Sequence, residues 1–345
     1  MQIIDSHFHW WPRAVFEALC KRKDFPRSEP NARGGYEFWS PGGRQEKFLG
    51  GWAEWFDIDE QLAHMDSLGR DRIDVVSSIG PFSVAFSYMP KDMGREFANL
   101  WNDEMATAQR NHPGRVWASA AVPLVDTDTA LEVVDRAINK LGLMGVNLPS
   151  SVGDDPRIDA ERLEPFYDYC EKLGVPLFLH PTDAVFQDML IDGYGGALFS
   201  SLGRVVEVST AAMRLILSGV MERHPNLKIV MSHTGGALPY QSGRMDKNTK
   251  AAKLPRPVSE YIKRMYTDTV SPHTAGMKFA IEYYGVDRVM YGTDYPCWDP
   301  ATCLELFDKM GLSQADQEKI FAGNARRILN LKDPVPAKAR EAALV

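Results

Sequence analysis

The stretch IIDSHFH, residues 3–9, joins a short apolar run to two histidines that are two residues apart. An apolar run of this kind predicts a buried strand. Residues two apart on a strand point to the same face, so His7 and His9 could hold one cation together. In a barrel of parallel strands, the carboxyl end of the strand is where such chemistry is carried out.

Seven further apolar runs follow along the chain, each of the length of a strand. They cover residues 73–76, 116–122, 143–148, 176–179, 228–231, 265–266 and 289–291, of which 265–266 and 289–291 are shorter and weaker than the others. Helical apolar spacing appears between them, at residues 58–68, 127–141, 161–173, 211–224 and 276–284. Alternating strands and helices imply parallel pairing with helical crossovers. Eight such units predict an α/β fold, the (β/α)8 TIM barrel.

Residues 22–51 interrupt this alternation with prolines, glycines, arginines and aromatic residues. We interpret them as an insertion after strand 1 that lies over the barrel mouth as a lid, with a disordered surface excursion as the alternative. Residues 1–331 would then form a single barrel domain. Residues 332–345 would form a C-terminal arm that packs on the outside or on a neighbouring subunit.

Charge and composition narrow the class of protein. The 345 residues include 39 basic and 46 acidic side chains, for a formal net charge of −7, which argues against general nucleic-acid binding. The four cysteines form no CxxC pair and are sparse for a secreted disulfide scaffold. No signal peptide is evident, and no apolar run approaches the roughly 20 residues of a membrane span. We therefore expect a cytoplasmic enzyme with neither nucleic acid nor membrane as a partner.

More side chains that can bind metal follow other predicted strands. His180 ends the run in PLFLHP, His233 follows KIVMS, and Asp294 follows RVMYGT. We expect His7, His9, His180 and Asp294 to bind one divalent metal, zinc first, with iron, manganese or cobalt as alternatives. His233 could be a further ligand, or could stand beside a metal-bound water as a general acid or base.

Several longer motifs accompany these residues: FLHPTD at 178–183, SHTGGALPYQSGRMD at 232–246, GTDYP at 292–296, FSY at 86–88, YTD at 266–268 and GNARRIL at 323–329. Together they resemble the amidohydrolase superfamily, in the branch of 2-amino-3-carboxymuconate-6-semialdehyde decarboxylase and related aromatic-acid decarboxylases. The resemblance implies one metal, usually zinc, on the four ligands named above, with His233 and Asp294 as catalytic residues. It also implies a homodimer in which Arg244 holds a substrate carboxylate, a role that suits a planar guanidinium.

The sequence departs from this family in two places. A second substrate-binding arginine is expected in the helix matching residues 57–66, where this chain has Gln61 and Ala63. Its substitutes could be the arginines of the insertion: Arg27, Arg33 and Arg44. Binuclear members commonly carry a bridging Lys or Glu after strand 4, where this chain has Asn147. An uncharged amide is a poor bridge, which favours one metal, although Asp183 or Asp294 could bridge a second.

The predicted activity is decarboxylation of a small carboxylic acid, a carbon–carbon lyase reaction that uses a metal-bound water. Hydrolysis or hydration by the same residues is one alternative, and oxygen chemistry at an iron or manganese pair is another. A supporting subunit in a hetero-oligomer with a related barrel is the non-catalytic alternative. An apolar mouth around the substrate would be lined by aromatic residues. The candidates are Trp10, Phe86 and Trp298 first, then Trp11, Tyr88, Phe186 and Tyr295.

Overall fold

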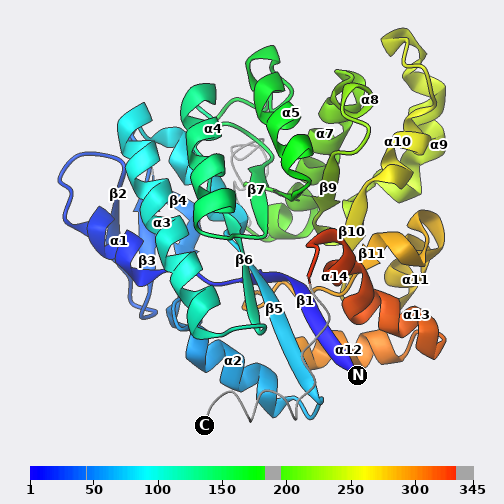
Figure 1. Cartoon of the computed structure of the whole chain (residues 1–345), viewed down its shortest axis with the longest axis horizontal. Coiled ribbons are helices and arrows are strands. Elements are labelled where there is room, and N and C mark those ends of the chain that lie inside the picture. Colours follow the sequence, from blue (N-terminus) through cyan, green and yellow to red (C-terminus); the bar gives the residue numbers. More distant parts are fainter. Residues whose placement is uncertain (44, 183–195, 332–345) are drawn as a thin grey trace.

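The computed structural model describes residues 1–43, 45–182 and 196–331. Within these residues, eight parallel strands form one sheet in the order β1-β5-β6-β7-β8-β9-β10-β11. The strands are β1 (Gln2–His9), β5 (Arg72–Ser78), β6 (Val116–Ala120), β7 (Gly145–Pro149), β8 (Pro176–His180), β9 (Lys228–Met231), β10 (Tyr266–Asp268) and β11 (Val289–Met290). Each predicted strand is present, and helices surround the sheet (Figure 1). The predicted TIM barrel is confirmed.

The barrel closes between β1 and the segment that follows β11. Backbone hydrogen bonds of 2.8–2.9 Å cross this seam: Ser6 N to Tyr291 O, Asp294 N to His7 O, and His9 N to Tyr295 O. A side chain reinforces them, because the Asp5 carboxylate accepts hydrogen bonds from Thr293 N at 3.1 Å and Thr293 Oγ1 at 2.5 Å. Closure therefore runs through the residues on either side of the predicted metal ligands.

The helices lie outside the strands, and each predicted helical region is helical. These regions are α2 (Ile58–Ser67), α4 (Thr127–Asp135) with a π-helical turn at Arg136–Lys140, α5 (Glu164–Leu173), α7 (Arg204–Leu217) with α8 (Val220–Arg223), and α11 (Thr274–Tyr284). The others are α3 (Lys91–Asn111), α9 (Leu238–Asn248), α10 (Val258–Arg264), α12 (Pro300–Asp308), α13 (Gln314–Glu318) and α14 (Asn324–Ile328). Local signals set several ends: Asp57 caps α2 by accepting from Glu60 N, and Gly174 ends α5 with φ +67°. Among the described helices, none is long and apolar enough to cross a membrane.

The insertion after β1 is confirmed, but it is not the structureless loop that its composition suggests. α1 (Arg13–Cys20) precedes it, and residues 22–51 contain an antiparallel sheet of β2 (Arg27–Pro30), β3 (Tyr36–Trp39) and β4 (Gln45–Gly51). Tyr36 and Phe38 alternate with more exposed residues, so both point into the core, where the Phe38 ring lies 5.3 Å from Phe82. Its action as a lid stays a prediction. The predicted arm 332–345, Arg44, Asp183 and Phe186 lie outside the described residues.

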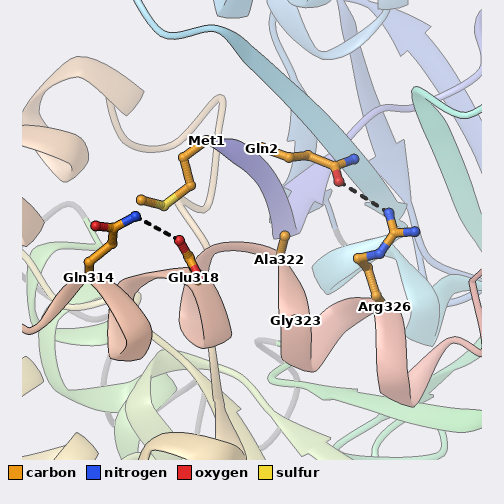
Figure 2. A pocket seen from close by; sticks show the side chains of 7 residues that line it. All are labelled: Met1, Gln2, Gln314, Glu318, Ala322, Gly323 and Arg326. Atoms are coloured by element: carbon orange, nitrogen blue, oxygen red, sulfur yellow. Dashed lines mark hydrogen bonds between the residues drawn. The ribbon is translucent and has the colours of Figure 1, made fainter. Parts of the chain in front are cut away.

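A hollow of about 540 Å³ lies at the end of the barrel where β1 begins (Figure 2). Met1, Gln2 and residues of α13 and α14 line it, and Arg326 Nη1 donates a hydrogen bond to Gln2 Oε1. Because Gln2 begins β1 whereas His7 and His9 end it, the hollow lies at the opposite end of the barrel from the histidines. In TIM barrels that end serves stability and the other serves catalysis.

Phe86, a predicted substrate contact, lies in the hydrophobic core. It belongs to η2 (Gly80–Tyr88), is fully buried, and has the rings of Phe82 and Trp101 each 5.9 Å away. Packing accounts for its position without a bound ligand.

Phe86→Ala should therefore lower the free energy of unfolding by about 3–5 kcal/mol, because truncating a buried ring leaves a cavity. Chemical denaturation followed by circular dichroism measures the change. Trp298→Ala is the control, since that side chain is 43% exposed and its loss should change stability by less than about 0.5 kcal/mol. A Phe86→Ala protein as stable as the wild type would contradict the packing role.

Gly80 allows the His9 ring to lie against the start of η2. Its φ is +60°, and a Cβ atom there would lie 2.5 Å from His9 Cε1. Gly80→Ala should therefore displace His9 and lower the metal content of the protein, measured by inductively coupled plasma mass spectrometry. Gly69→Ala is the matched control, because Gly69 has φ +70° but no atom within 4 Å of the added Cβ. Both variants carry the left-handed strain of about 1–2 kcal/mol, so equal metal content in the two would rule out the contact with His9.

Candidate metal centre

The four predicted metal ligands meet at the carboxyl end of the barrel. His7 and His9 end β1, His180 ends β8, and Asp294 lies four residues beyond β11. Each is buried, and one ligand atom from each lies within 4.8 Å of the others. The three imidazole rings are 5.0–5.2 Å apart between centroids. The closed barrel thus brings together residues up to 287 positions apart in the sequence (294 − 7).

Hydrogen bonds turn one nitrogen of each imidazole toward the centre of this cluster. His7 Nδ1 donates to Asp268 Oδ2 at 2.6 Å, and His180 Nδ1 donates to Pro181 O at 2.7 Å. The Nε2 atoms of His7 and His180 are buried and have no hydrogen-bond partner. A buried polar atom left in this state is costly. Three nitrogens and one carboxylate are a donor set that zinc and related divalent metals accept, so these residues fit a metal.

His9 and Asp294 complete the cluster. His9 Nδ1 faces Ser78, with Ser78 Oγ at 3.1 Å, and His9 Nε2 lies 2.9 Å from Asp294 Oδ1. The same Asp294 oxygen is 3.3 Å from His7 Nε2. Asp294 has φ +63°, a left-handed conformation that costs a non-glycine residue about 1–3 kcal/mol. Strain of this size is common where a side chain is held for function.

The two buried carboxylates of Asp268 and Asp294 give the cluster a negative charge that a proton or a cation must balance. Burial alone would raise the pKa of Asp294, but the charge of His7 and the close approach of His233, His7 and His9 hold this pKa well below its usual value. Burial lowers the pKa of His7, and the carboxylates of Asp294 and Asp268 outweigh this and raise it to about 10. Burial and the neighbouring histidines lower the pKa of His180 far below normal, so it is neutral. Two ionised carboxylates among histidines are balanced by a proton on His7 or by a cation.

His233 lies beside this cluster. Its Nε2 is 3.5 Å from Asp294 Oδ2, and its ring centroid is 5.2 Å from that of His7. Its Nδ1 is buried without a partner. The backbone of His233 and Thr234 is left-handed, with φ +54° at both, and their N–H groups donate to the Asp268 carboxylate. The structure therefore places His233 where either predicted role, ligand or acid–base group, could be served.

Asn147 is occupied by the barrel wall. Its Nδ2 donates to Ala120 O at 2.9 Å, and its Oδ1 accepts from Ile79 N and Ser119 Oγ. Next to it is a cavity of about 20 Å³, room for one water molecule. Among the described residues, one group of His, Cys, Asp and Glu side chains has the geometry for a cation. Asn147 is thus held by hydrogen bonds to the barrel wall, and the number of metals stays a prediction.

The predicted substrate contacts differ in how far they are exposed to solvent. Trp10 is 7% exposed, Trp298 is 43% exposed, and Tyr295 stacks on Phe8. Arg244 is exposed on α9, with no hydrogen bond or ion pair in the described part of the chain. The arginines of the insertion that the structure describes are engaged: Arg27 pairs with Glu29, and Arg33 lies 4.4 Å above the Trp52 ring.

Three buried residues that touch the cluster were not singled out from the sequence as site residues. Asp268 holds His7 Nδ1, and Trp55 stacks on the His9 ring at 5.4 Å. Gln61 stands in place of the family's arginine, and its Nε2 ties His9 O to Glu54 O, at 2.9 and 2.7 Å. Asp268 had a signal, because it is an acidic residue that directly ends a predicted strand region, as the ligands do. Gln61 was noticed only as the replacement of an expected arginine, and Trp55 had no signal, since its contact depends on how the segment between β1 and α2 folds back.

Comparisons with known proteins match this geometry. The chain is 34% identical over 287 residues to gamma-resorcylate decarboxylase of Rhizobium sp. (strain MTP-10005), which covers 79% of this chain and 87% of that protein. It is 29% identical over 281 residues to 2-amino-3-carboxymuconate-6-semialdehyde decarboxylase of Dictyostelium discoideum, covering 78% and 76%. The crystal structure of a 2,6-dihydroxybenzoate decarboxylase with 2,6-dihydroxybenzoate superposes with a TM-score of 0.78 at 29% identity, over 96% of this chain and 100% of that one.

The family itself follows from the extent of the match. A sequence model described as amidohydrolase matches residues 4–331, which span every strand of the barrel and all four residues of the cluster. The resemblance seen in the sequence motifs is thereby confirmed. The chain belongs to the amidohydrolase family and is an enzyme of that family.

Proposed function

We propose that this enzyme is a metal-dependent decarboxylase of an aromatic carboxylic acid. The observation that carries the proposal is the buried cluster of His7, His9, His180 and Asp294 in a chain that is 34% identical to a gamma-resorcylate decarboxylase. Relatives named for decarboxylation of dihydroxybenzoate and of a carboxymuconate semialdehyde support the reaction class. The choice of an aromatic acid rests on these relatives and on the aromatic residues near the cluster.

Zinc is the metal we propose, bound by His7, His9, His180 and Asp294. Neutral imidazole nitrogens with a carboxylate oxygen suit zinc, and manganese or iron accept the same donors. A divalent cation here would polarise substrate oxygen atoms and lower the pKa of water bound to it.

In this scheme His233 provides the proton of the reaction. The bond between the ring carbon and the carboxyl carbon breaks, carbon dioxide leaves, and a proton takes its place on the ring carbon. His233 suits this task because its Nε2 faces Asp294 Oδ2 at 3.5 Å and its side chain is 11% exposed. His233 thus lies beside the cluster and is partly exposed, as a group that gives a proton to a bound substrate must be.

Arg244 would hold the substrate carboxylate in a homodimer. It is exposed on α9, whose Tyr240 is 78% exposed and lies 6.4 Å from the exposed Phe279 ring of α11. An aromatic pair exposed in this way is typical of a protein interface, and an arginine next to it could reach the barrel mouth of a second copy. The alternative partner at this surface is a different chain with a related barrel.

Hydration is the alternative reaction. The chain is 24% identical over 220 residues to a 2-keto-4-carboxy-3-hexenedioate hydratase of Sphingobium sp. (strain NBRC 103272 / SYK-6). The same cluster could activate water toward a double bond. Only decarboxylation releases carbon dioxide, so the two reactions are separable with one assay.

The purified, zinc-loaded protein should release carbon dioxide from a member of a panel of hydroxybenzoic acids that includes 2,6-dihydroxybenzoate. A coupled assay measures the carbon dioxide and chromatography measures the decarboxylated product. The two should form in equal amounts. Removal of the metal with a chelator should abolish the activity, and added zinc or manganese should restore it. Water addition to an unsaturated acid, without carbon dioxide from any panel member, would favour the hydratase.

Two histidine variants should separate metal binding from proton transfer. His180→Ala should lose both metal and activity, because it removes a ligand. His233→Gln should keep about one metal per chain but lose turnover by about 100-fold or more, since general acid–base catalysis contributes on that scale. His112→Ala is the control, because His112 is not part of the cluster and its Nε2 lies 3.4 Å from Asp59 Oδ1. This variant should keep both the metal content and the turnover of the wild type. Loss of metal from His233→Gln would instead identify His233 as a ligand.

A further inference from the structure

Asp268 connects the metal cluster to His233 through one buried carboxylate. It is the last residue of β10 and is 2% exposed. Its Oδ2 accepts from His7 Nδ1 at 2.6 Å and from His233 N at 3.2 Å. Its Oδ1 accepts from Thr234 N and Val270 N, each at 3.0 Å. Each oxygen therefore accepts hydrogen bonds from two N–H groups, so both lone pairs of each oxygen are used.

The bond to His7 fixes which ring nitrogen can face a metal. A carboxylate only accepts hydrogen bonds when ionised, so His7 Nδ1 carries the proton. The Nε2 lone pair is then free, and Nε2 is the atom that lies buried and unpartnered in the cluster. Outer partners of this kind orient a metal-binding histidine and raise its basicity.

The bonds to the turn hold His233 in place. His233 and Thr234 both have φ +54°, a conformation that costs about 1–3 kcal/mol for each non-glycine residue. Hydrogen bonds from both of their N–H groups to Asp268 stabilise this turn. β10 pairs with β9, the strand that leads into His233, so the carboxylate lies directly beside the turn.

We infer that Asp268 is a positioning residue that sets both the ligand nitrogen of His7 and the place of His233, so that one side chain controls metal affinity and turnover. The role of His233 in turnover rests on the proposed function. The control of metal affinity does not.

Asp268→Asn tests this inference with little change of shape. The asparagine amide replaces one of the two acceptor oxygens with an NH2 donor. Whichever way the amide is turned, two of the four N–H groups that bonded to Asp268 then face this NH2 group and lose their acceptor. With the NH2 toward His7, Nδ1 of the imidazole must accept a hydrogen bond, so the ring proton moves to Nε2. A protonated Nε2 can no longer bind metal. With the NH2 toward Thr234 and Val270, the turn of His233 loses support.

Metal affinity should fall by about 10- to 100-fold in Asp268→Asn, measured by competition of zinc with a fluorescent chelator. At saturating zinc, kcat should still fall by about 100-fold while KM changes little, because His233 is displaced from the reacting carbon. Asp74→Asn is the matched control: Asp74 is equally buried, accepts from Gln2 Nε2, and lies at the other end of the barrel. It should keep wild-type affinity and kcat, even if its stability falls.

Nitrogen-15 NMR of histidine-labelled, zinc-loaded wild-type protein gives a second test that does not depend on Asp268→Asn. His7 should show a proton on Nδ1, shifted downfield and slow to exchange with water, and its Nε2 should carry none. The signal is assigned by its loss in His7→Gln. A His7 with its proton on Nε2 would overturn the inference, as would Asp268→Asn with wild-type metal affinity. If the wild type releases no carbon dioxide, the proposed function fails, while affinity and NMR still decide the role of Asp268.

Discussion

Closure of the barrel between β1 and the residues after β11 is the constraint on which the rest of the site depends. The backbone bond from Asp294 N to His7 O, 2.8 Å long, joins two predicted ligands directly. The Asp5 carboxylate spans the same seam, since it accepts from His7 N on one side and from Thr293 on the other. An open sheet with the same strands would leave His7 and Asp294 on opposite edges. In this protein, fold and metal cluster are therefore one cooperative feature.

Closure of the barrel also brings acidic side chains together in a buried environment. Asp5, Asp268 and Asp294 are all at most 2% exposed and lie around three buried imidazoles. Burial raises the pKa of Asp5 to about 7, whereas His7 and its neighbours keep the pKa values of Asp268 and Asp294 low. Buried charge of one sign is unfavourable unless it is paired. A divalent cation bound by the four ligands would supply that pairing.

Much of this could be predicted from the sequence because the signals are local. Each strand contains a short apolar run, and each ligand lies close after such a run, as His180 follows PLFL. What could not be predicted depends on contacts between distant segments. The sheet of residues 27–51 was hidden by its prolines and glycines, and Phe86 reads as a mouth residue until Trp101 is found beside it. Helix α3 was missed although its buried Phe97, Trp101 and Met105 recur every four residues, which is the spacing of one helix face.

If the closed barrel builds a single metal centre, His7, His9, His180 and Asp294 must bind one ion together. Anomalous X-ray diffraction from crystals of the zinc-loaded protein, recorded on both sides of the zinc absorption edge, locates that ion. We expect one strong anomalous peak per chain, within about 2.0–2.2 Å of one nitrogen of each histidine and one oxygen of Asp294. A peak held by other side chains, or two peaks bridged by a common ligand, would contradict it.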